Sequence, residues 1–270
     1  MAVETLGSGD DVVLVHGALS WGRDTFSAQL HLADRVRLHV VDRRGYVAAG
    51  PPVEGEVGWP VDVPDLVALL EDLGGAHLVG HSYGGVDALI VAGERPELVR
   101  SLVVVEPPVY GLAEDPAVDA LAARIGEVFA RGPQLSPEEF YGQWASLVLG
   151  LHDRVIQYAV HHWTPEHRAA ADATRFEALP TASPVRWDGV RRVAQRMVVS
   201  GGWPAEHRRA ATRPEGAAGA RAFQLAAAAV ARHAEVGLTR FPDSGHTPQL
   251  TEAAAFDDLL LRTWSAAQAP

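Results

Sequence analysis

Short apolar runs alternate along the chain with longer stretches in which apolar residues recur at helical spacing. The short runs are bounded by turn-forming residues, which is typical of strands buried on both faces of a sheet. They lie at 11–15, 37–41, 76–79, 101–105, 196–200 and 236–241. The helical stretches lie at 21–33, 63–73 and 86–94, in an alanine-rich region before 236, and from 252 onward. Because strands that alternate with helices form parallel sheets, the pattern predicts an α/β fold with a mostly parallel sheet flanked by helices.

The middle of the chain departs from this alternation. From about residue 110 to residue 185, helical stretches are separated by prolines, and no stretch has the apolar, β-branched character of a strand. We therefore predict one α/β core made of residues 1–109 and 186–270, with an inserted helical cap at 110–185.

The composition fits a large globular domain and removes several kinds of chemistry. The 270 residues are 47% hydrophobic, which is enough for a substantial buried core. The chain has no cysteine, so a disulfide framework, a thiolate metal site and a thiol nucleophile are all excluded. Nucleophilic chemistry is therefore left to oxygen.

The charge and hydropathy of the chain bear on its partners and location. The formal net charge is −11 without a basic stripe, which argues against nucleic acid and anionic membranes as partners because both repel acidic surfaces. Residues 1–11 hold no basic segment followed by an apolar core, and no uninterrupted apolar run of about 18 residues occurs. We expect a soluble, cytoplasmic protein, and the pattern gives no indication of its oligomeric state.

The strongest chemical signal in the chain is Gly80-His81-Ser82-Tyr83-Gly84. It matches G-x-S-x-G, and it follows a predicted strand and precedes a predicted helix. In such a sharp turn, small residues are needed on both sides of the serine, because a side chain there would collide with neighbouring backbone. The turn exposes the hydroxyl, so we interpret Ser82 as a nucleophile; a glycine-rich turn with an incidental serine is the alternative.

Together with His16-Gly17 after the first strong strand and Gly245-His246 near the end, this motif resembles the α/β-hydrolase superfamily over nearly the whole chain. The resemblance implies a parallel sheet, a cap over the carboxyl ends of its strands, and a catalytic triad in the chain order serine, acid, histidine. Such a triad uses no metal and no organic cofactor. Few residues precede Val12, so we expect the amino-terminal hairpin of the superfamily to be shortened, leaving an abbreviated sheet edge.

A serine nucleophile needs a base within about 3 Å, and histidine suits this role near neutral pH. The resemblance assigns it to His246. His81 adjoins the serine, but neighbouring residues on an elbow point apart, so we expect it to pack beneath the turn. A group of three histidines and one glutamate could suggest a metal site. No second cluster accompanies it, so we favour the interpretation that these residues lie on a solvated or cleft-lining cap helix. This group comprises His161, His162, Glu166 and His167.

The acid of the triad has more than one candidate. Most superfamily members carry it after the penultimate strand, where residues 201–204 hold no carboxylate and Glu206 is the first. Certain lactonases and haloalkane dehalogenases instead carry it at the end of the strand that follows the nucleophile helix, where Glu106 stands. A carboxylate there can orient the imidazole and stabilise its protonated form. We favour Glu106, with Glu206 and Asp243 as alternatives.

Two further groups of residues complete the prediction. The resemblance assigns the oxyanion hole to the backbone N–H groups of Ala18 and Tyr83. Aromatic residues of the cap region favour an apolar or aromatic substrate, although any one of them can equally serve packing. They are Tyr110, Phe140, Trp144, Tyr158, Trp163 and Trp187. The stretch 106–112 also resembles lactonases that open resorcylic macrolactones such as zearalenone.

We therefore hypothesise a serine hydrolase that cleaves a carboxylic ester or lactone of a small apolar molecule through an acyl-enzyme. Carbon–carbon bond hydrolysis or lyase chemistry on the same fold is one alternative, and a non-catalytic ligand-binding member is another. Retention of Ser82, His246 and a plausible acid argues against the second. Epoxide and haloalkane hydrolysis are disfavoured because those relatives carry aspartate at the elbow.

Overall fold

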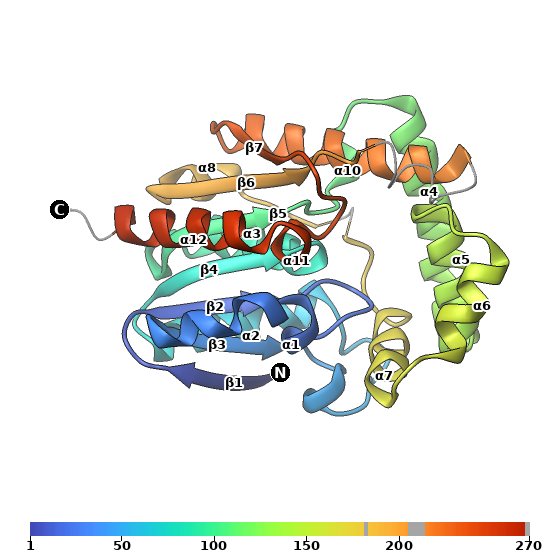
Figure 1. The fold of residues 1–270 in the computed structure, drawn as a ribbon, viewed down its shortest axis with the longest axis horizontal. Coiled ribbons are helices and arrows are strands. Elements are labelled where there is room, and N and C mark those ends of the chain that lie inside the picture. The colour runs from blue at the N-terminus through green and yellow to red at the C-terminus, as the bar shows by residue number, and fades with distance from the viewer. Residues whose placement is uncertain (181–182, 205–213, 268–270) are drawn as a thin grey trace.

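A seven-stranded sheet, in the order β1-β3-β2-β4-β5-β6-β7, organises the fold (Figure 1). The computed structural model describes residues 1–180, 183–204 and 214–267. The strands are β1 (Ala2–Gly7), β2 (Asp11–Val15), β3 (Arg37–Asp42), β4 (Ala76–His81), β5 (Val99–Val105), β6 (Gln195–Gly201) and β7 (Leu238–Phe241). All neighbouring pairs are parallel except β1 with β3. The predicted α/β class with a mostly parallel sheet is confirmed, and its first edge is a single antiparallel strand.

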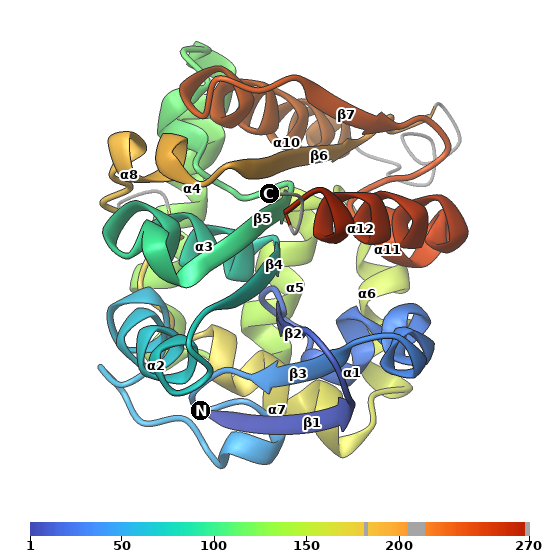
Figure 2. The same cartoon turned by 90° about the vertical axis from the view of Figure 1, so that its left-hand side faces the viewer.

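Helices cover both faces of the sheet, α2, α3 and α8 on one face and α1 and α12 on the other (Figure 2). The helices are α1 (Gly22–Thr25), α2 (Trp59–Asp72), α3 (Tyr83–Glu94), α4 (Pro116–Ala130), α5 (Pro137–Val148), α6 (Asp153–His161), α7 (Pro165–Thr174), α8 (Trp187–Arg192), α10 (Pro214–His233), α11 (Pro248–Thr251) and α12 (Ala253–Ala267). The central strands are buried on both faces, which explains their continuous apolar runs.

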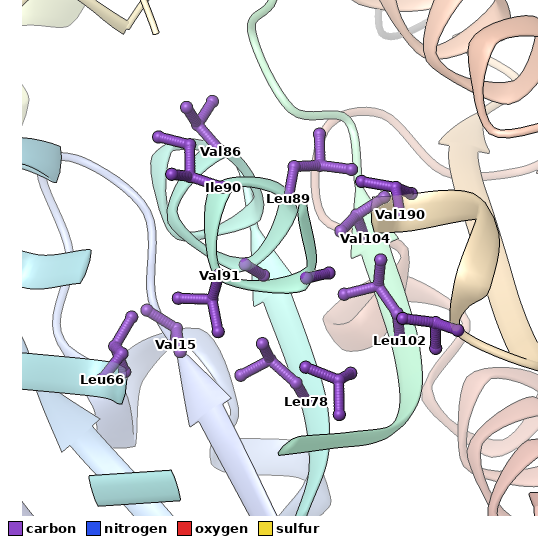
Figure 3. Close-up of a cluster of buried hydrophobic side chains, with 14 of the residues drawn as sticks. Val15, Leu66, Leu78, Val86, Leu89, Ile90, Val91, Leu102, Val104 and Val190 are labelled. Carbon is purple, nitrogen blue, oxygen red and sulfur yellow. The ribbon is translucent and has the colours of Figure 1, made fainter. Parts of the chain in front are cut away.

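The hydrophobic core on the α3 face fixes the helix that follows the nucleophile motif (Figure 3). Leu89 and Val91 of α3 are fully buried in one cluster with Leu78 of β4 and Leu102 of β5. Because α3 is buried along nearly its whole length, it holds the preceding turn in place.

Helices α4 to α7 lie beyond the carboxyl ends of the parallel strands (Figure 1), in the region of the predicted cap, and we refer to them as the cap helices. Their hydrophobic cluster also includes Ala222 and Phe223 of α10, a helix that follows the predicted cap in the sequence. The chain boundaries 110 and 185 remain a prediction.

The expected helix at 21–33 is wrong. The structure has the short α1, followed by a 3₁₀ helix at Ser27–Asp34. Phe26 separates them with φ −117° and ψ 23°, outside the helical region, and its side chain is fully buried beneath the sheet. Over the described part of the chain, no helix combines the length and apolarity needed to cross a membrane.

Candidate active site

Ser82 occupies a strained turn between β4 and α3. Its φ of 51° and ψ of −119° are unusual for a residue with a side chain, and its N–H donates to the carbonyl of Val105 at 2.8 Å. A Cβ at Gly80 would lie 2.3 Å from the Gly84 carbonyl oxygen, and one at Gly84 would lie 2.4 Å from that of His16. The two glycines are therefore required by close backbone approach, as the motif predicts.

His246 and Glu106 meet at the same edge of the sheet. Glu106 directly follows β5, and His246 lies in the loop after β7. The imidazole Nδ1 is 2.7 Å from Glu106 Oε2, and the carboxylate is completely buried whereas the imidazole is 16% exposed. With Nδ1–H donating to Glu106, Nε2 is left as the acceptor that a general base requires.

The other carboxylate oxygen of Glu106 is fixed by donors from the end of β6. Oε1 accepts hydrogen bonds from Ser200 Oγ at 2.8 Å, the Gly201 N–H at 2.9 Å and the Trp203 indole N–H at 2.9 Å. A buried carboxylate needs such partners, because burial of a polar oxygen without a hydrogen bond is unfavourable. The side chain is thereby held in one orientation toward His246.

Four non-glycine residues around this edge have left-handed backbone conformations. Leu19, Ser82, Glu106 and Trp203 have φ values of 59°, 51°, 43° and 52°. Such residues are held against their backbone preference by their surroundings, and they concentrate at functional sites.

His81 packs beneath the turn, as predicted. Its Nε2–H donates to the carbonyl of His246 at 2.9 Å, and the two rings lie 4.7 Å apart. Burial, followed by the proximity of His246, lowers the pKa of His81 to about 3. His81 therefore stays neutral and supports the position of His246.

A small apolar pocket of about 30 Å³ joins Ser82 to Ala18 and Tyr83. Tyr83 is the first residue of α3, so its backbone N–H has no acceptor within the helix. This N–H lies at the positive end of the helix dipole. The rest of the lining consists of Pro108, Tyr110, Ile125, Phe129, Trp144, Pro180 and Phe223. The Phe223 ring also packs on His246 with centroids 4.0 Å apart, which places the imidazole beside the pocket.

The model of the alpha/beta hydrolase family matches residues 12–259 of the chain. The chain belongs to this family. A 2-(acetamidomethylene)succinate hydrolase of Mesorhizobium japonicum is 33% identical over 127 residues, covering 46% of this chain and 44% of that protein. A pimeloyl-(acyl-carrier protein) methyl ester esterase of Aeromonas hydrophila is 35% identical over 122 residues, covering 43% and 44%. Each match thus spans less than half of the relative's length.

The fold is shared across the full length of solved structures. MenH from S. aureus superposes with a TM-score of 0.67 and covers 99% of both chains at 17% identity. At that identity the likeness shows the α/β-hydrolase fold alone.

The aromatic residues that the sequence analysis proposed for substrate binding lie in different places in the structure. Tyr110 and Trp144 line the pocket beside Ser82. Trp163 lines a separate pocket of about 340 Å³ with Leu19 and His167, and Tyr158 is 67% exposed. Trp187, the first residue of α8, packs on His233 at the end of α10 with ring centroids 5.0 Å apart, and it does not line the pocket beside Ser82.

Several residues of the candidate site could not be identified from the sequence. Phe129 and Phe223 line the pocket from α4 and α10, and Trp203 holds the acid. The only available signal was that Trp203 occupies the segment where most relatives carry the acid. Glu206, the alternative acid, lies outside the described residues. In the part that is described, no group of three or more His, Asp or Glu side chains has the arrangement of a metal site.

Proposed function

We propose that this hydrolase cleaves carboxylic esters or lactones of small apolar molecules through a serine acyl-enzyme. The observation that carries the proposal is the 2.7 Å contact of His246 Nδ1 with the buried Glu106, at the edge of the pocket that Ser82 lines. The two relatives, a 2-(acetamidomethylene)succinate hydrolase and a methyl ester esterase, support the same reaction class.

The proposed reaction begins when Ser82 Oγ attacks the carbonyl carbon and its proton passes to His246 Nε2. The tetrahedral oxyanion accepts hydrogen bonds from the backbone amides of Ala18 and Tyr83. Collapse expels the alcohol, which takes the proton from His246, and leaves an acyl-Ser82 ester. A water that His246 deprotonates then attacks the acyl carbon, and the acid leaves as Ser82 Oγ takes the proton back from His246. Glu106 stabilises each imidazolium. The apolar lining favours an apolar acyl group.

Intact-mass labelling with a fluorophosphonate tests the nucleophile. The wild type should gain one adduct at Ser82 and hydrolyse p-nitrophenyl esters, whereas Ser82→Ala should lose both the adduct and activity. A Ser82→Ala protein with full esterase activity would refute the proposal. Comparison with Glu206→Gln, which should label normally, tests the alternative acid.

The choice of substrate separates ester hydrolysis from carbon–carbon bond cleavage. Purified wild type is assayed with p-nitrophenyl esters and with a β-diketone under the same conditions. Cleavage of the diketone alone would assign the site to carbon–carbon chemistry, and apolar ligand binding without any labelling would assign it to a binding protein.

A further inference from the structure

The oxyanion-hole loop rests on a completely buried arginine. Arg43, just after β3, donates from Nε to the carbonyl of His16 and from Nη2 to the carbonyl of Gly17, both at 3.1 Å. His16 Nε2 accepts from the Arg43 N–H at 3.1 Å, so its Nδ1 carries the proton and donates to Gly17 O at 2.6 Å. Burial and Arg43 hold the pKa of His16 well below its usual value, which keeps this tautomer neutral.

These contacts orient the peptide that carries one of the proposed oxyanion donors. In a planar trans peptide the carbonyl and the N–H point in opposite directions. Two donors on the Gly17 carbonyl therefore aim the Ala18 N–H away from Arg43. A Cβ at Gly17 would lie 2.8 Å from Ser82 Cβ, so this peptide lies directly against the nucleophile. Hydrogen bonding from a charged donor also polarises the peptide and strengthens its N–H as a donor.

Residues at the end of α7 and just after it also contact Arg43 and the two oxyanion-donor regions. Glu177, after α7, places Oε1 2.6 Å from Arg43 Nη2 and accepts from the Tyr46 hydroxyl at 2.6 Å. Thr174 Oγ1 accepts from the Leu19 N–H at 2.9 Å. The Tyr83 hydroxyl donates to the carbonyl of Ala178 at 2.7 Å. The segment 174–178 thus contacts both oxyanion-donor regions.

We infer that Arg43 is a positioning residue for the oxyanion hole. Through its ion pair with Glu177, this positioning depends on the contact of the cap with the core. The inference rests on the proposed function of Ser82, Ala18 and Tyr83. The planar guanidinium suits the task because its fork donates to His16, Gly17 and Asp62 simultaneously, with Asp62 Oδ2 at 3.0 Å. The guanidinium also stacks on Tyr46 and Tyr83, each 4.6 Å from its carbon.

The test compares Arg43→Lys with Arg44→Lys. Lysine at 43 keeps the charge among the buried carboxylates but cannot reproduce the fork, so kcat for p-nitrophenyl butyrate should fall about 10- to 100-fold. KM should change less than about threefold, because the lost interaction acts in the transition state. Inhibition by phenylboronic acid, whose adduct on Ser82 places an oxygen in the oxyanion hole, should weaken by the same factor as kcat/KM. Arg44 instead pairs with Asp65 at 2.6 and 2.8 Å, and its variant should match the wild type.

Two further variants test the contribution of the cap. Glu177→Gln and Thr174→Val should each lower kcat about three- to tenfold, and Glu177→Gln should add little in the Arg43→Lys background because both act through one contact. All rates are normalised to fluorophosphonate-titrated sites, so a loss of folded protein does not imitate the effect. If Arg43→Lys does not fold, the two cap variants decide.

The outcomes separate this inference from the proposed function. Wild type that is not labelled at Ser82 refutes the proposed function. Normal labelling of wild type, with unchanged kcat and boronate affinity in Arg43→Lys or in both cap variants, overturns the role of Arg43 and leaves the proposed function intact. A fall in thermal stability with unchanged kcat per titrated site shows a structural role only.

Discussion

Oε1 of Glu106 receives its hydrogen bonds from the segment that carries the acid in most relatives of the superfamily. Ser200, Gly201 and Trp203 all donate to its Oε1. The end of β6 therefore supplies donors to a carboxylate at the end of β5, instead of the carboxylate itself. Since β5 and β6 are adjacent and parallel, the two positions lie beside one another, and an acid on either strand can reach the histidine after β7.

Replacement of Glu106 by glutamine tests this assignment. The amide keeps the shape and can still accept at one atom, but an NH₂ facing Nδ1 favours the wrong imidazole tautomer. We expect kcat to fall about 10³- to 10⁴-fold with the protein still folded. Asp243→Asn, in the loop before His246, is the matched control and should retain wild-type kcat. Loss of activity in Asp243→Asn together with an active Glu106→Gln would show that Asp243, and not Glu106, is the acid of the triad.

At the residue scale, the sequence reveals groups that belong to short motifs and misses those defined by tertiary contact. Ser82 and His246 stand in recognisable local patterns. Arg43 does not, because an arginine after a strand is usually solvated, and only the fold shows that it is 0% exposed. The position of Phe223 in the pocket could not be predicted either, because the alanine-rich sequence around it indicates a helix but not which part of the molecule that helix contacts.

At the scale of elements, the pocket is built by α4 and α10 more than by α5 to α7. Ile125 and Phe129 come from α4, and Phe223 comes from α10. The Phe223 ring is stacked with Trp203 at an interplanar angle of 6° and packs on His246. The helix assigned to the core thus contributes to the same pocket as the cap, and specificity should follow both.

Phe223→Ala should enlarge the pocket and change the preference for acyl length. The pocket of about 30 Å³ has little room, and removal of a buried ring opens space for a longer chain. We expect the ratio of kcat/KM for p-nitrophenyl octanoate to that for the acetate to rise about tenfold, which corresponds to the burial of about two more methylenes at about 0.8 kcal/mol each. Tyr158→Ala, at an exposed cap position, should leave this ratio unchanged. An unchanged ratio in Phe223→Ala would place the acyl group elsewhere.

At the scale of the whole molecule, the alternation of apolar runs and helical stretches is sufficient to predict a mostly parallel sheet flanked by helices. The edge strand β1, which is mostly exposed and lacks an apolar run, was not predicted. The segment 21–33 was predicted as one helix, but it holds the short α1 and part of a 3₁₀ helix, separated at the buried Phe26. Both depend on neighbours that the local pattern does not contain.

The cap and the core are joined through a buried group with excess negative charge. Burial raises the pKa of Glu177 from 4.5 to about 6, despite the opposing effect of Arg43, and burial also raises the pKa values of Asp62 and Asp87. An acid whose pKa is higher in the folded state binds its proton more tightly there. Its contribution to stability is therefore present below pH 4.5 and is lost as the pH rises through 6.

Glu177→Gln should remove this pH dependence. The shift from 4.5 to about 6 corresponds to about 2 kcal/mol, so wild type should lose that much stability relative to the variant between pH 4.5 and pH 7. Urea unfolding of both proteins at the two pH values measures the difference. A constant difference would show that Glu177 does not titrate in this range. The groups that face Glu177, and that are unchanged in the variant, are Arg43, Asp62, Asp87, Tyr46 and Tyr83.

The left-handed backbone conformations of Leu19, Ser82, Glu106 and Trp203 lower the stability of the folded protein at the proposed site. Each conformation costs about 1–3 kcal/mol that glycine would not incur. Trp203 and Glu106 are buried and hydrogen-bonded, so loss of either side chain would cost more than this strain. The side chain of Ser82 is small, so a laboratory selection for heat resistance alone would favour glycine at this position and discard the proposed nucleophile. Ser82 should therefore be held constant when the stability of this protein is increased by substitutions elsewhere in the chain.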